Sequence, residues 1–190
     1  GAVVRLAPIK DVKTMIYAFF ELHERLPKVR LHIMGGVDDE EYGAECHALV
    51  ETLGVRDLIF TGRVNVVEYM EKLDFTILTS ISEGQPLSVL ESLAARRPCV
   101  TTEVGCCREL LEGAPGDDFG VAGFVTPPMY RKGLADAMER MCVSRARRIE
   151  MGERGQRRVS TYFLHEQMLA NYRALYDETA RAFNLPREGE

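Results

Sequence analysis

Two glutamates mark the most informative stretch of this 190-residue chain. Glu83 lies on a loop that follows the strand-like residues 75–78, and Glu91 lies inside the helix that Pro86 is expected to open. In a parallel α/β sheet such a loop belongs to the carboxyl edge of the strands, where free backbone N–H groups and the helix dipole attract phosphate. Carboxylates there are able to accept hydrogen bonds from hydroxyl groups. The pattern predicts a ligand that carries both groups, as a nucleotide joined to a sugar does.

Two cations near the start of the chain form the other half of this expected site. Arg5 follows apolar strand residues, and Lys10 precedes a helix whose expected N-cap is Asp11. A cation near a helix N-terminus is mildly unfavourable, so Lys10 is expected either to reach solvent, the usual fate of a lone lysine, or to lie beside an anion.

Each glutamate also has a simpler explanation. A helical wheel drawn from Leu87, Leu90 and Ala94 places Glu91 beside an apolar stripe, where an ionised carboxylate is costly without partners. The alternative is a carboxylate at the helix edge that pairs with an arginine or reaches solvent. For Glu83 the alternative is an acid that complements the helix dipole.

The loop around Glu83 offers backbone donors as well. Gly84 allows an unusual backbone angle, and the N–H groups of Gln85, Leu87 and Ser88 are placed to meet sugar or phosphate oxygens. Proline has no N–H, so Pro86 cannot donate.

Other loop ends carry weaker signals. Gly36 ends a strand, where it permits a sharp turn or close backbone approach, and no GxGxxG pattern is present to favour a dehydrogenase. Arg63 follows the next strand, and a surface salt bridge is the favoured role of its side chain. Glu109 lies just inside a second expected turn-to-helix element that begins at Gly105, and its simpler role is to stabilise that helix.

No metal or redox site is expected. The acidic pairs at 38–39 and 117–118 fall in turn-like regions and are interpreted as solvated acids. The five cysteines form no CxxC pair, so reduced and mostly buried thiols are predicted, and a metal or redox pair at the adjacent Cys106 and Cys107 is disfavoured because no histidine lies at ligand spacing.

Strand-like runs alternate with helical periods, which is typical of a parallel α/β sheet with helices on both faces. The strands are expected at 3–7, 29–34, 58–61, 75–78, 99–102 and 123–125. One helix should begin near Asp11, and the next should stop at Gly54. Beyond residue 128 strand-like runs cease, and helices are expected at 134–142, 145–158 and 165–183.

These patterns predict a single domain with a core at 1–128, C-terminal helices at 129–185 and a frayed tail at 186–190. The chain is expected to be a piece of a longer protein. Tyr172 and Tyr176 on the last helix either face a partner domain or pack on this one. The formal net charge of −5 argues against general nucleic-acid binding, and no transmembrane span or signal peptide is expected.

The chain resembles the retaining family 4 glycosyltransferases, which have the GT-B fold of two facing Rossmann-like domains. The resemblance covers most of the chain up to about Pro128. It rests on the following residues: Arg5, Lys10, Gly35-Gly36, Phe60-Thr61-Gly62-Arg63, Glu83-Gly84, Leu90-Glu91, Pro98, Gly105, Glu109 and Gly123-Phe124-Val125.

Within that family, the motifs at 83–87, 104–109 and 122–128 look most like the Pel exopolysaccharide glycosyltransferases, whose implied donor is UDP-glucose. The family often has an aromatic residue and a glycine where this chain has Gln85 and Pro86.

The resemblance implies a role for each site residue. Glu91 would bind the ribose hydroxyls, and Glu83 would hold hydroxyls of the transferred sugar near the reaction centre. Arg5 and Lys10 would neutralise the departing diphosphate. The segment before Arg63 would contact the nucleobase through its backbone.

The same resemblance places Glu109 near the nucleotide and implies catalysis without a metal or other cofactor. The expected whole protein is a retaining hexosyltransferase that binds a nucleotide-sugar donor here and a growing polysaccharide through an N-terminal domain, and this piece alone is expected to be inactive. It would be cytoplasmic, either free or held at the inner membrane face through a polysaccharide-synthesis complex. A noncatalytic nucleotide-sugar sensor and a GT-B nucleotide-sugar epimerase are the alternatives.

Overall fold

The structure, a computed structural model, describes residues 1–183, so all of the expected tail at 186–190 lies outside the described residues. Its six strands are β1 (Ala2–Val3), β2 (Leu31–Met34), β3 (Leu58–Gly62), β4 (Thr76–Leu78), β5 (Cys99–Thr102) and β6 (Gly123–Thr126). All neighbouring strands within the sheets β1-β2-β3 and β4-β5-β6 are parallel.

Gly1 joins the two sheets side by side. Its nitrogen donates to the Phe75 carbonyl, and its carbonyl accepts from the Ile77 N–H, both at 2.9 Å. The strands therefore run in the order 3-2-1-4-5-6, which places a reversal of strand order between β1 and β4. Ligands of doubly wound folds bind in the crevice at the carboxyl side of such a reversal.

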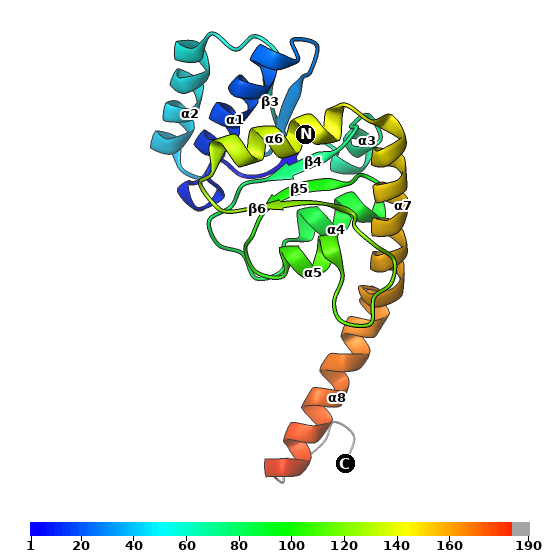
Figure 1. Cartoon of the computed structure of the whole chain (residues 1–190). Helices are drawn as coiled ribbons and strands as arrows, with labels where there is room; N and C mark the ends of the chain where they lie inside the picture. Colours follow the sequence, from blue (N-terminus) through cyan, green and yellow to red (C-terminus); the bar gives the residue numbers. More distant parts are fainter. Residues whose placement is uncertain (184–190) are drawn as a thin grey trace.

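Helices cover both faces of the sheet, as expected (Figure 1). One face carries α1 (Val12–Arg25), α2 (Glu40–Leu53) and α6 (Arg131–Cys142), and the other carries α4 (Leu87–Ala94) and α5 (Cys107–Glu112). A 3₁₀ turn, η1 (Pro8–Lys10), precedes α1, and the five-residue α3 (Val66–Met70), which was not predicted, links β3 to β4.

Local signals set several of these boundaries. Asp11 caps α1 by accepting a hydrogen bond from the Thr14 N–H, although its own φ is 45°. Asp39 caps α2 in the same way through the Tyr42 N–H. The helix ends at Gly54 with φ 66°, a left-handed conformation that suits glycine, as predicted.

The composition change at residue 128 is not a boundary of packing. On α6, Leu134, Met138 and Met141 are at most 1% exposed and belong to the main core with α1. The next helix, α7 (Arg145–Tyr162), packs against α4 and α5. We therefore regard α6 and α7 as integral layers of the domain.

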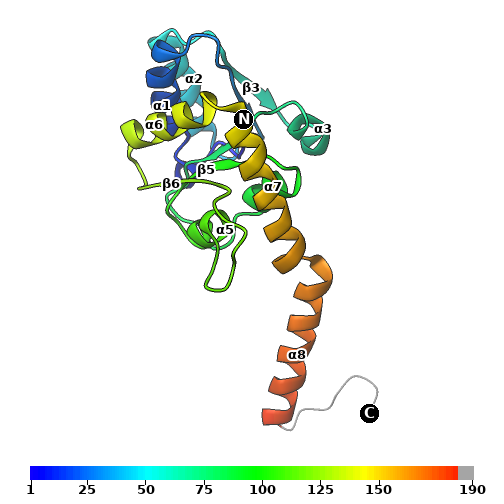
Figure 2. The same ribbon diagram turned by 45° about the vertical axis from the view of Figure 1, so that its right-hand side comes forward.

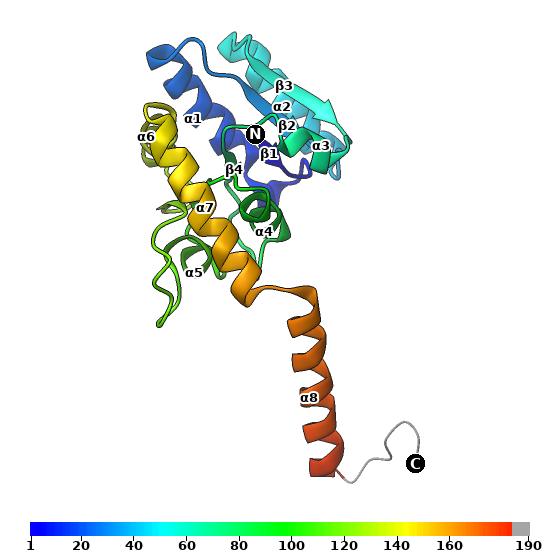
Figure 3. The ribbon, with the colours of Figure 1, turned by 90° about the vertical axis from the view of Figure 1, so that its right-hand side faces the viewer.

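Only α8 (His165–Phe183) extends away from the body, as Figures 1, 2 and 3 all show. None of its residues is buried, and Tyr172 and Tyr176 are 51% and 68% exposed. The alternative that these tyrosines pack on this domain is therefore wrong. No helix within residues 1–183 is both long and apolar enough to cross a membrane.

One prediction about a charged residue is also wrong. Asp117 is not a solvated acid, because its side chain is 3% exposed and pairs with Arg158. The residue with a left-handed conformation after α4 is Arg96, with φ 58°. Arg97 has a different task, since its guanidinium donates to the carbonyls of Met70 and Glu71 at the end of α3.

Candidate functional site

Lys10 and Glu83 meet at the carboxyl edge, across the reversal of strand order. Their Nζ and Oε1 atoms are 2.6 Å apart, and the two side chains are 20% and 15% exposed. Lys10 ends the turn that follows β1, and Glu83 lies on the loop that follows β4. Of the two alternatives for Lys10, solvent or a neighbouring anion, the structure shows the second, and the anion is the carboxylate of Glu83.

Backbone contacts fix the two loops against each other. The hydroxyl of Thr79 donates to the carbonyls of Lys10 and Asp11, at 2.9 and 3.1 Å. The N–H of Ile81 donates to the Ile9 carbonyl at 2.9 Å. These hydrogen bonds hold the backbones of the two loops together, so the Lys10–Glu83 contact does not rest on the two long side chains alone.

The loop after β5 supports the Glu83 loop from the other side. The Cys106 N–H donates to the Gly84 carbonyl at 3.0 Å. Gly105 has φ 51°, and a Cβ atom there would overlap the carbonyl oxygens of Glu83 and Gly84. The expected turn at Gly105 is thus required for the close approach of these two loops.

Arg5 lies at the same edge but in a more open position. Its guanidinium pairs with Asp38 at 2.7 Å, and the two side chains are 64% and 45% exposed. Such a solvated pair contributes little to stability, so an anionic ligand is able to draw Arg5 away at small cost.

The N-terminus of α4 faces this loop without a side-chain cap. The helix begins at Leu87, one residue later than predicted, and Pro86 is its N-cap. No hydrogen-bond acceptor within residues 1–183 is found for the N–H groups of Leu87 and Ser88. These groups, with the exposed Gly84 and Gln85, suit an anion or a sugar oxygen.

Glu91 lies on a different face of α4 from the one that the helical wheel predicted. The buried face consists of Val89, Ser92 and Leu93, whereas Leu87 is 67% exposed and Glu91 is exposed with it. The prediction that Glu91 borders the core is wrong. Its side chain makes no hydrogen bond or ion pair within the described residues, so it is open to a ligand.

Gly36 and Arg63 lie together beside this edge. The Gly36 carbonyl accepts from the Leu6 N–H at 3.0 Å, and a Cβ atom at Gly36 would lie 3.1 Å from the Arg63 Nε. Arg63 is exposed and forms none of the ion pairs found within residues 1–183, so the predicted salt bridge is absent there. Glu109 is exposed in the first turn of α5.

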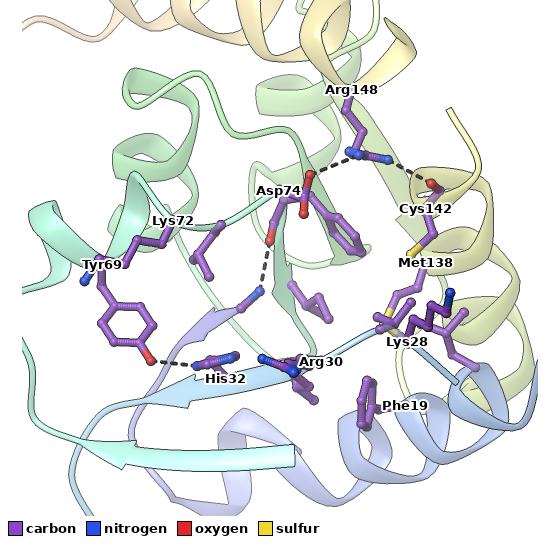
Figure 4. Close-up of a pocket in the computed structure, with 17 residues that line it drawn as sticks. Phe19, Lys28, Arg30, His32, Tyr69, Lys72, Asp74, Met138, Cys142 and Arg148 are labelled. Atoms are coloured by element: carbon purple, nitrogen blue, oxygen red, sulfur yellow. Dashed lines mark hydrogen bonds and ion pairs between the residues drawn. The ribbon is translucent and has the colours of Figure 1, made fainter. Parts of the chain in front are cut away.

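A separate cavity of about 580 Å³ opens at the opposite, amino edge of the sheet (Figure 4). Two pairs of polar side chains in its lining contact each other. Arg148 contacts Asp74 at 2.9 Å, and the Tyr69 hydroxyl lies 2.6 Å from the Nδ1 atom of His32. None of the predicted site residues lines it, so this cavity is distinct from the candidate site.

All five cysteines are free, and Cys46, Cys99 and Cys107 are buried. Burial raises the pKa of the Cys46 and Cys107 thiols to about 11, which disfavours thiolate chemistry at neutral pH. No group of three or more His, Cys, Asp or Glu side chains within residues 1–183 is placed to hold a metal ion.

Sequence reasoning missed three small hydroxyl residues that build the site from below. Thr79, Ser80 and Thr102 are at most 1% exposed and hydrogen-bond the loops described above. The available signal was a polar residue at the carboxyl end of each apolar strand, at positions that the sheet buries.

The chain matches the family described as "Glycosyl transferases group 1" over residues 1–143. The chain belongs to this family. It is 26% identical over 175 residues to N-acetyl-alpha-D-glucosaminyl L-malate synthase of Bacillus anthracis, which covers 91% of this chain and 43% of that protein. The chain thus spans less than half the length of this curated relative.

Solved structures with the same fold include two longer proteins. Sucrose-phosphate synthase of Thermosynechococcus elongatus superposes with a TM-score of 0.81 at 23% identity, over 95% of this chain and 45% of that one. Anabaena HepE, solved with UDP and glucose, gives a TM-score of 0.78 at 23% identity, over 92% and 47%. The predicted α/β fold and the prediction of a GT-B glycosyltransferase domain are confirmed, whereas the closeness to Pel enzymes stays a prediction.

Proposed function

We propose that this chain is the donor-binding half of a retaining group 1 glycosyltransferase and that its donor is UDP-glucose. The observation that carries the proposal is the Lys10–Glu83 contact at the reversal of strand order. One cation and one carboxylate in contact suit a ligand whose diphosphate and sugar lie side by side. The Anabaena structure, which contains UDP and glucose, supports this choice of ligand.

Each group in the site has a defined task in this proposal. Lys10 and Arg5 neutralise the diphosphate as it leaves, together with the free N–H groups of α4, and they supply this charge without a metal. Glu83 accepts hydrogen bonds from the transferred sugar and stabilises developing positive charge. Glu91 accepts from two vicinal ribose hydroxyls, which suits an exposed carboxylate that has no protein partner.

In this proposal, the acceptor is bound by another domain of a longer protein. Apolar side chains surround the carboxyl edge, and four of them are 42–67% exposed: Ile9, Val37, Ile81 and Leu87. We propose that an N-terminal domain covers this edge, carries the polysaccharide acceptor and contacts the exposed apolar side chains of α8. The attacking acceptor hydroxyl would approach on the face from which the diphosphate leaves, and a phosphate oxygen would take its proton. We propose a cytoplasmic location, where nucleotide sugars are made.

The test is a titration of this chain with UDP-glucose, UDP, ADP-glucose and GDP-mannose by ligand-observed NMR. We expect binding of the two uridine ligands, with Glu91→Ala weakening both and Glu153→Ala, an exposed glutamate on α7, leaving them unchanged. EDTA should have no effect. Binding of ADP-glucose or GDP-mannose instead would overturn the proposed donor, and the absence of all binding would overturn the proposed site.

A further inference from the structure

Ser80 contacts the carboxylate of Glu83 from the buried side of the loop. Its hydroxyl donates to Glu83 Oε1 at 2.6 Å, and the residue is 0% exposed. Its own carbonyl accepts a hydrogen bond from the Thr102 hydroxyl, also at 2.6 Å and buried. Ser80 is therefore a donor on a fixed support, fastened to the end of β5.

Lys10 contacts the same oxygen of Glu83 at the same distance. The two donors differ in mobility, because the lysine ammonium ends a flexible chain that is 20% exposed, whereas the serine hydroxyl is attached to a buried backbone. Oε2 of Glu83 takes part in none of the hydrogen bonds within the described residues. A diphosphate bound at this edge would compete with Glu83 for Lys10. The buried Ser80 hydroxyl would keep its hydrogen bond to Glu83, because a ligand cannot reach it.

We propose that Ser80 is the positioning residue of Glu83. When the donor diphosphate draws Lys10 away, the Ser80 hydroxyl keeps Oε1 in place, so that Oε2 faces the hydroxyls of the donor sugar. On binding, Lys10 thus changes its partner from Glu83 to the diphosphate, and Glu83 changes its partner from Lys10 to the sugar of the same ligand. This inference rests on the proposed function.

The exchange has a signature that a structural role for Ser80 would not produce. Ser80→Ala should leave the affinity for UDP unchanged, because UDP has no transferred sugar. Its affinity for UDP-glucose should fall by about tenfold, which corresponds to one hydrogen bond to a charged acceptor. Glu83→Gln should also weaken UDP-glucose relative to UDP, and UDP itself should bind a few-fold more tightly because Lys10 is no longer held by a carboxylate.

The deciding experiment is a double-mutant cycle on this chain, read as dissociation constants for UDP and UDP-glucose by calorimetry. If Ser80 acts through Glu83, Ser80→Ala should have almost no further effect in the Glu83→Gln background. Ser82→Ala is the matched control, since Ser82 is exposed on the same loop and makes no side-chain hydrogen bond within residues 1–183. Thr102→Val, which loosens the support of Ser80, should give a smaller loss of the same kind if Ser80→Ala fails to fold.

The outcomes separate the two proposals. The positioning role would be overturned if the two substitutions raised the dissociation constant for UDP-glucose independently, so that their fold-changes multiplied in the double variant. It would also be overturned if Ser80→Ala weakened UDP and UDP-glucose equally. In both cases the proposed function stands. A wild-type chain that binds neither ligand would overturn the proposed function, and this inference with it.

Discussion

At the scale of single residues, Asp117 and Arg158 form the most deeply enclosed charge pair within the described residues. Their side chains are 3% and 1% exposed, and two guanidinium nitrogens reach the two carboxylate oxygens at 2.5 and 3.0 Å. Arg158 also donates to the carbonyls of Leu110, Leu111 and Gly120. Removing one partner of such a pair leaves a buried charge without compensation.

Asp117→Asn is therefore expected to lower the free energy of unfolding by about 3 kcal/mol at neutral pH. Hydrogen bonds from Arg158 hold the pKa of Asp117 below its ordinary value of 3.8. The stabilisation by this carboxylate is present above that ordinary value and is lost as pH falls through the lower pKa of the folded state. Urea unfolding from pH 7 down to pH 3 should show the gap between wild type and variant shrinking below about pH 4.

The adjacent Asp118 provides the control for this prediction. It is exposed and has no ion pair within residues 1–183, so Asp118→Asn should change stability by no more than about 0.5 kcal/mol. The assigned role of the pair would be contradicted if both variants lost the same free energy of unfolding. It would also be contradicted if the difference between wild type and Asp117→Asn did not change with pH.

At the scale of elements, α7 fits against the rest of the domain through two glycines. A Cβ atom at Gly152 would overlap the backbone carbonyl of Arg96, in the left-handed turn after α4. A Cβ atom at Gly155 would approach the flexible side chain of Leu93 instead. The backbone obstacle cannot move without shifting the turn, whereas the side chain can rotate.

Helix propensity alone favours alanine at either position by about 1 kcal/mol. We expect Gly152→Ala to destabilise the protein by more than about 2 kcal/mol in spite of this gain, since overpacking displaces backbone. Gly155→Ala should cost clearly less. Thermal unfolding of the two variants checks the order, and a stabilised Gly152→Ala would show that α7 does not require this close contact.

The sequence predicted the elements whose ends carry strong local signals. Gly54 ended a helix, and five of the six strands were placed within about two residues of their bounds. The first was shorter than expected, because regular pairing ends at Val3 and only an isolated parallel bridge between Leu6 and Val37 follows it. The face of α4 was misjudged because this eight-residue helix carries apolar side chains on several sides, so only its neighbours decide which side is buried. The short α3 has too few residues to show a period.

The site was predicted in part for the same reason. Lys10 and Glu83 were found because charged residues beside an expected helix start are conspicuous. Their direct contact depends on which strands are neighbours, and no local pattern gives that order. Ser80 escaped notice because serine is common in loops, and only its complete burial distinguishes it.

At the scale of the whole molecule, the body of the domain is independent of α8. The apolar side chains of this helix are exposed: Met168 at 44%, Leu175 at 55% and Phe183 at 72%. Truncation after residue 163 should therefore leave the melting temperature within about 2 °C of the full chain and preserve UDP binding. Truncation after residue 129 should abolish cooperative unfolding, because it removes the buried face of α6 and Arg158.

These truncations are compared by differential scanning calorimetry, with light scattering as a second reading. The full chain should self-associate more than the shortened one, since the exposed stripe is removed with α8. A large fall in melting temperature without α8 would mean that the helix folds back onto the body in solution.

The position of Arg158 also has a consequence for synthesis on the ribosome. The carbonyl of Leu110 accepts its hydrogen bond from Arg158, a donor that lies 48 residues further along the chain. A nascent chain that has emerged only as far as β6 has all six strands, but the Leu110 carbonyl and Asp117 still lack Arg158, and the face of α4 that α7 covers is exposed. Compaction during translation should thus be delayed until α7 emerges, and an arrested nascent chain that has left the ribosome only up to residue 128 should still be sensitive to protease.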